Sequence, residues 1–88
     1  MMINIPKEFT ILRQTEDMVE IKSKYHYWMI IAISGSENMY LLAHKHKEND
    51  KYHKQKLKYG NPSTANMIFS HIHAHDNYIK QIKEGSGD

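Results

Sequence analysis

The stretch YHYWMIIAISGSENMYLLAHKH, residues 25–46, decides the fold. Two runs rich in aromatic and branched aliphatic residues flank SGSEN, residues 34–38, which is a cluster of turn-forming residues. Tyr, Trp and Ile are enriched in β-strands. We therefore predict an antiparallel hairpin with strands at residues 25–34 and 39–46.

Side-chain alternation then assigns the residues of this hairpin to two faces. A tight turn around Ser36 and Glu37 would pair Ile33 with Tyr40 and Met29 with His44. The first predicted face is apolar and comprises Trp28, Ile30, Ala32, Met39, Leu41 and Ala43. The second is mixed and comprises Tyr25, Tyr27, Met29, Ile31, Ile33, Tyr40, Leu42, His44, His46 and His53. A one-residue error in the turn would exchange the faces of one strand.

The rest of the chain extends this hairpin into a small α+β domain. Further strands are expected at residues 9–13, 17–23 and 51–58, and a turn at Glu48-Asn49 would pair His44 with His53 and Tyr40 with Leu57. A helix is predicted over residues 62–83, with Asn61 as the N-cap and Pro62 in the first position. The fold prediction is an antiparallel meander of three to five strands followed by one C-terminal helix packed on one face. We expect a single domain over residues 1–84 and a flexible tail over 85–88.

Composition narrows the classes of function. The chain has 88 residues, no cysteine and a formal charge of +2 with its seven histidines neutral. Disulfides, thiolate metal sites and cysteine nucleophiles are therefore excluded. No signal peptide, membrane-spanning run, nucleophile elbow or glycine-rich phosphate loop is present. We expect a cytoplasmic, non-enzymatic protein that does not enter a membrane, with no catalytic residues and no cofactor.

The densest basic segment gives the preferred hypothesis of function, a small binding module that is a nucleic-acid-associated or regulatory protein. Lysines on a strand would contact the phosphates of a nucleic acid, and binding of this kind weakens as salt is added. Lysines on an edge strand also deter aggregation, which is the alternative interpretation. The predicted nucleic-acid-binding residues are Lys45, Lys47, Lys51, Lys54, Lys56 and Lys58.

The second predicted face gives an alternative hypothesis, a protein-binding inhibitor or adaptor. One helix covers only one side of a sheet, so an apolar second side needs the N-terminal segment, a ligand or a second copy of the chain to cover it. A homodimer is the simplest arrangement. Tyrosines are frequent anchors of protein interfaces. The predicted partner-binding residues are Tyr25, Tyr27, Tyr40, His44 and His53.

A third hypothesis is a histidine-based metal-binding module. His71 and His75 are separated by one helical turn, which lets two imidazoles share one metal ion. His73 points to the other side of the helix. A further ligand would have to come from His26, His44, His46 or His53. The alternative is that His75 is a hydrogen-bonded histidine at the edge of the core.

Overall fold

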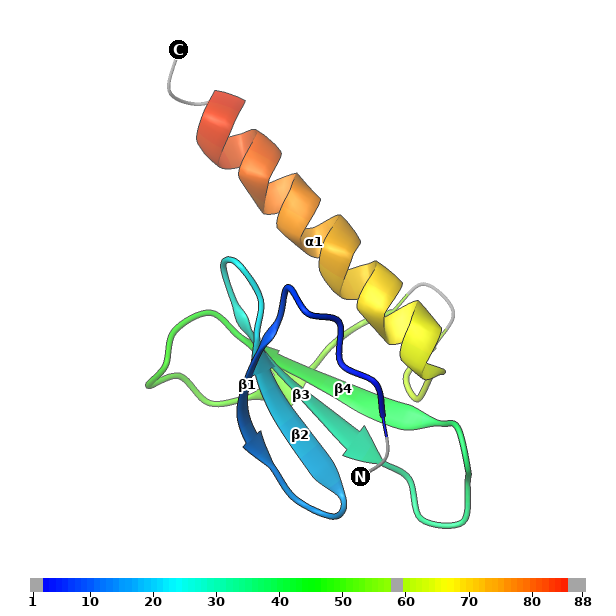
Figure 1. The fold of residues 1–88 in the computed structure, drawn as a ribbon. Helices are drawn as coiled ribbons and strands as arrows, with labels where there is room; N and C mark the ends of the chain where they lie inside the picture. Colours follow the sequence, from blue (N-terminus) through cyan, green and yellow to red (C-terminus); the bar gives the residue numbers. More distant parts are fainter. Residues whose placement is uncertain (1–2, 58–59, 86–88) are drawn as a thin grey trace.

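The computed structural model describes residues 3–57 and 60–85. Among these residues, five strands form one antiparallel sheet in sequence order, and a long helix crosses one of its faces (Figure 1). This confirms the predicted α+β meander with a C-terminal helix. The elements are β1 (Thr10–Gln14), β2 (Met18–Lys22), β3 (Tyr27–Ala32), β4 (Tyr40–Lys45), β5 (His53–Lys54) and α1 (Ala65–Gly85).

The predicted register of the central hairpin was wrong by one residue. Ala32 pairs with Tyr40, and Trp28 pairs with His44. The connection spans residues 33–39 and is centred on Ser36, with Gly35 at a φ of 84°. It therefore contains an odd number of residues, whereas the predicted two-residue turn contains an even number. Only a residue without a Cβ adopts such a positive φ without strain.

This shift moves alternate residues of β4 to the opposite face from the one predicted. Tyr40, Leu42 and His44 are buried and share the helix-facing side with Trp28 and Ile30. The residues expected on that side in β4, Met39, Leu41 and Ala43, are only partly buried. The predicted assignment of residues to the two faces was therefore wrong for β4 and right for β3.

The second hairpin follows its predicted register but is shorter. His44 pairs with His53, as expected, and β5 ends at Lys54 rather than at residue 58. Tyr40 does not pair with Leu57, because its backbone N–H and C=O are bonded to Ser63 at 2.8 and 2.9 Å. The segment before α1 therefore lies beside β4 in place of a longer β5.

The start of α1 also differs from the prediction. Ser63 is held in the bridge to Tyr40, so the helix begins at Ala65 and not at Pro62. Thr64 acts as the N-cap: its carbonyl accepts from the Ile68 N–H at 3.0 Å, and its Oγ1 accepts from the Met67 N–H at 3.4 Å. Within the described part of the chain, no helix is both long enough and apolar enough to cross a membrane.

Asn61, predicted to be the N-cap, has another structural role. Its side chain accepts a hydrogen bond from the Leu42 N–H at 3.0 Å. The same side chain donates to the carbonyls of Leu42 and Gln55 at 2.9 and 2.8 Å. Asn61 thus satisfies backbone groups along the edge of β4 and connects the segment before α1 to the sheet.

Replacing Asn61 with alanine should lower the free energy of unfolding by about 2–3 kcal/mol, because three partly buried backbone groups lose their partner. Urea unfolding would measure the loss. Asn66→Ala is the matched control, since Asn66 is exposed at the start of α1, and it should change stability by less than about 0.5 kcal/mol. Equal effects of the two substitutions would contradict this role for Asn61.

The core lies between the sheet and α1. The N-terminal segment closes it along the same side of the sheet (Figure 1), with Ile3 and Ile5 packed against the core and the Phe9 ring 6.0 Å from that of Phe69. The segment therefore does not cover the opposite face, which was one expectation for it. The buried apolar residues are Phe9, Val19, Ile21, Trp28, Ile30, Tyr40, Leu42, Ile68, Phe69 and Ile72.

The opposite face of the sheet carries a small polar network. Tyr52 donates a hydrogen bond to the Glu20 carboxylate at 2.5 Å, and the Lys45 amine lies 3.9 Å from the same carboxylate. That amine also donates to the Glu48 carbonyl at 2.7 Å and lies 4.5 Å from the centre of the Tyr52 ring. The loop between β4 and β5 thus covers part of this face and leaves Lys45 only 9% exposed.

Candidate metal centre

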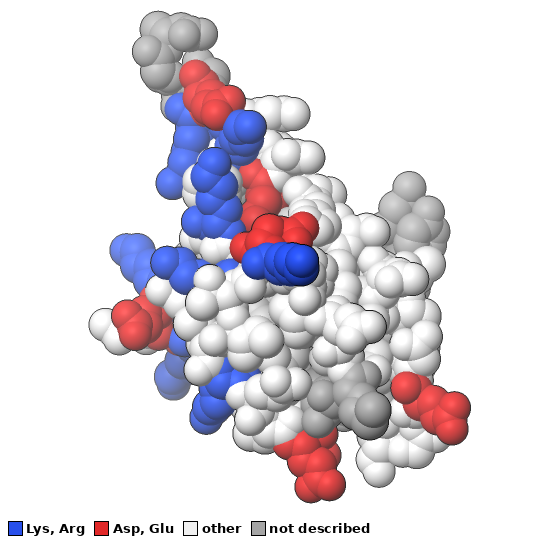
Figure 2. Space-filling model, viewed as in Figure 1, with Lys and Arg blue, Asp and Glu red and all other residues white. Residues whose placement is uncertain are grey.

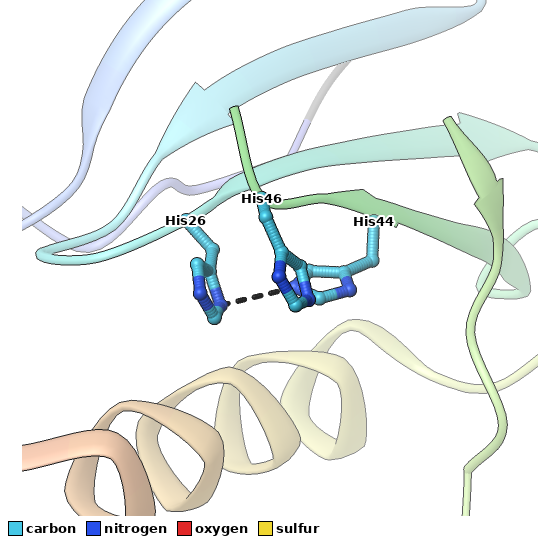
Figure 3. Close-up of side chains that lie close together, drawn as sticks. All are labelled: His26, His44 and His46. Carbon is cyan, nitrogen blue, oxygen red and sulfur yellow. Dashed lines mark hydrogen bonds between the residues drawn. The ribbon is translucent and has the colours of Figure 1, made fainter. Parts of the chain in front are cut away.

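Four histidines meet between the sheet and α1 at one end of the core. We call His26, His44, His46 and His75 the histidine cluster. The ring of His26 lies 4.4–4.9 Å from the other three, and that of His44 lies 5.0 Å from His46 and from His75. Figure 3 shows the three histidines that the sheet and its ends contribute, His26, His44 and His46, with their rings directed toward the helix. Two further histidines, His53 and His71, lie at the edge of this cluster.

The sheet register explains why these side chains meet. Trp28 and His44 face the helix. His26 lies two residues before Trp28, and His46 lies two residues after His44, so alternation places these two histidines on the helix-facing side as well. Trp28 pairs with His44, and continuing that register one step further places His26 opposite His46. The rings of His26 and His46 are accordingly stacked, with an interplanar angle of 9°.

The ring nitrogens of His26, His44 and His46 are close enough to share one metal ion. One nitrogen from each lies within 4.8 Å of the others. The Nδ1 atom of His26 and the Nε2 atom of His44 are 3.1 Å apart. Two nitrogen ligands of a tetrahedral zinc ion, at bonds of roughly 2.0–2.1 Å, lie roughly 3.3 Å from each other. This contact is a hydrogen bond in the metal-free protein, and its length is close to the separation that two ligands of one ion require, so an ion would take the place of the shared hydrogen.

The cluster favours neutral imidazoles, which are the form that binds metals. Burial, reinforced by His46 and His75, lowers the pKa of His26 to about 4. Burial, reinforced by His26 and His75, lowers the pKa of His44 to about 3. The pKa of His75 is also lowered, mainly by burial, although Asp76 opposes the shift. Unprotonated ring nitrogens are therefore present at neutral pH.

These pKa values predict that the metal-free protein is sensitive to acid. An unfolded histidine titrates near its ordinary pKa of 6.5, whereas the folded His26 and His44 titrate at about 4 and about 3. The unfolded state thus takes up protons first, and stability falls as the pH drops from about 6.5 toward 4. At about pH 5 the two histidines together should lower the free energy of unfolding by about 2–4 kcal/mol.

Urea unfolding at about pH 7.5 and about pH 5, with a chelator present, would measure this loss. His73→Gln should retain it, since His73 is exposed and lies apart from the cluster, beside Glu8. A free energy of unfolding that is unchanged between these two pH values would contradict the assigned pKa values.

A network of ring contacts and hydrogen bonds lies beside the histidine cluster. The indole of Trp28 lies 4.3 Å from the His44 ring and 5.2 Å from the His75 ring. Its Nε1–H donates to Ser23 Oγ at 2.9 Å, and that hydroxyl donates to an Asp76 carboxylate oxygen at 3.0 Å. The other Asp76 oxygen accepts from the Lys24 N–H at 3.3 Å. This chain links the sheet to α1 next to the histidines and fixes their backbone positions.

Of the predicted metal-binding pair His71 and His75, only His75 lies in the histidine cluster. Their rings are 6.5 Å apart, and the Nε2 atom of His71 lies 3.1 Å from the Gln55 side-chain nitrogen. His75 lies against His26 and His44 instead. The helical spacing therefore identified one member of the histidine cluster, His75. The other three members, His26, His44 and His46, were among the four further ligands considered from the sequence. The fourth of those, His53, lies at the edge of the cluster.

The predicted nucleic-acid-binding lysines do not form one continuous strip. Lys45 is buried in the network with Glu20 and Tyr52. β5 ends at Lys54, so the predicted strand does not extend to Lys56. Both of these lysines are exposed. Lys47 and Lys51 are exposed in the loop between β4 and β5. Lys58 lies outside the described residues.

The predicted partner-binding residues are divided between the two faces of the sheet. Tyr40 and His44 are buried on the helix side. Tyr27 is partly exposed on the opposite side, pairing with Lys45. The Tyr25 ring lies 5.4 and 4.9 Å from the amines of Lys24 and Lys83, and His53 is exposed on β5. These five side chains therefore do not share one surface.

Comparison with protein-family models, curated proteins and solved structures finds no match to this chain. The fold and the cluster together define the class: a small α+β domain with a histidine cluster between its sheet and its helix.

Proposed function

We propose that this protein is a non-enzymatic metal-binding module that holds one transition-metal ion on His26, His44 and His46. The observation that supports the proposal most strongly is the approach of three ring nitrogens to within 4.8 Å of one another. His26 and His44 are 8% and 3% exposed, so their rings are held in place by packing before any ion arrives.

The donor set restricts the metal. Imidazole nitrogen suits Zn²⁺, Ni²⁺, Cu²⁺ and Co²⁺, whereas Ca²⁺ and Mg²⁺ require oxygen ligands. His46 is exposed at the end of β4 and provides the side from which an ion enters. Asp76, the carboxylate nearest in sequence to the cluster, is already bonded to Ser23 and Lys24.

The single tryptophan of the chain is a built-in reporter for this site. Its ring lies 4.3 Å from that of His44, so a paramagnetic ion bound there should quench Trp28 fluorescence strongly. We expect Co²⁺ or Ni²⁺ to quench with a saturable curve that ends at one ion per chain. Mg²⁺ and Ca²⁺ should have no effect.

Two substitutions test whether the quenching comes from an ion bound at this site. His44→Gln should abolish saturable quenching, because it removes the central nitrogen of the site. His73→Gln should leave the titration unchanged, because His73 contacts Phe9 and Glu8 and not the cluster. Equal quenching in both variants would refute the proposal, as would a wild-type protein that shows no saturable quenching.

The other two functions considered from the sequence remain predictions. Figure 2 shows basic side chains gathered along one side of the molecule, over the C-terminal half of α1 and the adjacent end of the sheet, with acidic side chains among them. This mixture favours a nucleic acid less than the histidine geometry favours a metal ion. A partner protein or a second copy of the chain, predicted to bind through Tyr25, Tyr27, Tyr40, His44 and His53, likewise stays a prediction.

A further inference from the structure

The clearest unexplained feature of the cluster is a ring nitrogen of His75. Its Nδ1 atom is buried and has no hydrogen-bond partner among the residues that the structure describes. Leaving a buried polar atom unpaired in this way is unfavourable, because the atom loses its hydrogen bonds to water and gains none in return. A native structure seldom retains such an atom unless a ligand, ion or water satisfies it.

His75 lies beside the three histidines, but its nitrogens are not among those that lie within 4.8 Å of one another, so its side chain must move toward them to bind the same ion. Its ring lies 4.9 Å from that of His26 and 5.0 Å from that of His44. It approaches from α1, whereas the other three histidines come from the sheet and its ends. A tetrahedral ion on three sheet histidines has one position left, and the helix is on the side that those rings face (Figure 3).

We infer that His75 is the fourth ligand, so that the bound ion joins helix α1 to the sheet. This inference rests on the proposed function and adds a consequence to it. The site is closed, with four protein nitrogens and no water on the metal, which is the pattern of a structural site and not of a catalytic one. Binding therefore tightens the docking of α1, and the role of the metal is to set how firmly the helix is held.

The molecule provides a matched control one helical turn away. His71 is also a partly buried helix histidine, but its Nε2 atom already has Gln55 as its partner at 3.1 Å. Its ring is 6.5 Å from that of His75, at the edge of the cluster. His71→Gln and His75→Gln thus make the same chemical change in the same helix, and only His75→Gln removes the inferred ligand.

Cobalt substitution distinguishes the two coordination states. Four-coordinate Co²⁺ absorbs visible light strongly, whereas Co²⁺ that takes up waters and becomes six-coordinate absorbs weakly. We expect an intense spectrum for wild type and His71→Gln. His75→Gln should bind Co²⁺ at least roughly tenfold more weakly, and water in place of the imidazole should shift the spectrum and lower its intensity. Free imidazole added to His75→Ala should restore the intense spectrum by occupying the vacated position.

Hydrogen exchange tests the consequence for the helix. Zinc should slow exchange of the α1 amides around His75 in wild type and in His71→Gln, and it should slow them much less in His75→Gln. A His75→Gln variant with wild-type affinity, spectrum and exchange would overturn the inference while leaving the three-histidine site intact. Absence of Co²⁺ binding in the wild-type protein would instead refute the proposed function itself.

Discussion

Zinc at a hundredfold excess over its dissociation constant should raise the free energy of unfolding by about 2.7 kcal/mol, because the ion binds the folded chain and not the dispersed histidines of the unfolded one. For a domain of this size the melting temperature should rise by roughly 10–20 °C. A chelator should reverse the rise. Thermal unfolding followed by circular dichroism measures it.

The effect should depend on the cluster alone. His44→Gln should remove the zinc-dependent rise, and His73→Gln should preserve it. Magnesium should produce no rise in any of the three proteins, because the inferred ligands are imidazole nitrogens and magnesium requires oxygen ligands. If zinc stabilises His44→Gln as much as wild type, the ion binds elsewhere on this histidine-rich chain and the assignment of ligands is wrong.

Replacing Trp28 with alanine should lower the free energy of unfolding by about 3–5 kcal/mol, which is a large share of the stability of a small domain. Trp28 is fully buried, packs against His44 and His75, and donates to Ser23. The substitution leaves a cavity between the sheet and α1 and removes the link from Ser23 to the indole. Far-ultraviolet circular dichroism in urea measures the loss, since the variant has no tryptophan.

Tyr78→Ala is the aromatic control for this substitution. Tyr78 is 62% exposed on α1, so its truncation should change stability by less than about 0.5 kcal/mol. A small loss for Trp28→Ala, comparable to that of the control, would mean that the core does not depend on the contact between the sheet and helix α1 at this residue.

The sequence predicted the elements better than it predicted their register. The runs of Tyr, Trp and Ile on either side of residues 34–38 predicted the two central strands, because strand residues must pack against neighbours on a half-buried surface. The hairpin turn was harder, since residues 34–38 fit both a two-residue turn and the longer loop that forms. A single residue in that loop decided which side of β4 faces the helix.

The same register error hid the candidate metal centre. With Trp28 opposite His44, the strands bring His26, His44 and His46 to one face, next to α1. The spacing of two residues puts His44 and His46 on one side of a strand, but only the sheet pairing reveals that His26 lies beside them. His75 was found from its helical spacing to His71, although its contacts are with the sheet histidines. Asn61 was assigned as an N-cap from local propensity, and tertiary contacts with Leu42 and Gln55 gave it another role.

The central claim is that imidazole nitrogens of the sheet and the helix surround one ion. X-ray absorption spectroscopy of the zinc-loaded protein at one ion per chain tests it most directly. We predict a first shell of nitrogen at roughly 2.0 Å with the outer-shell scattering that imidazole rings produce. A shell dominated by oxygen, without the imidazole signal, would contradict the account.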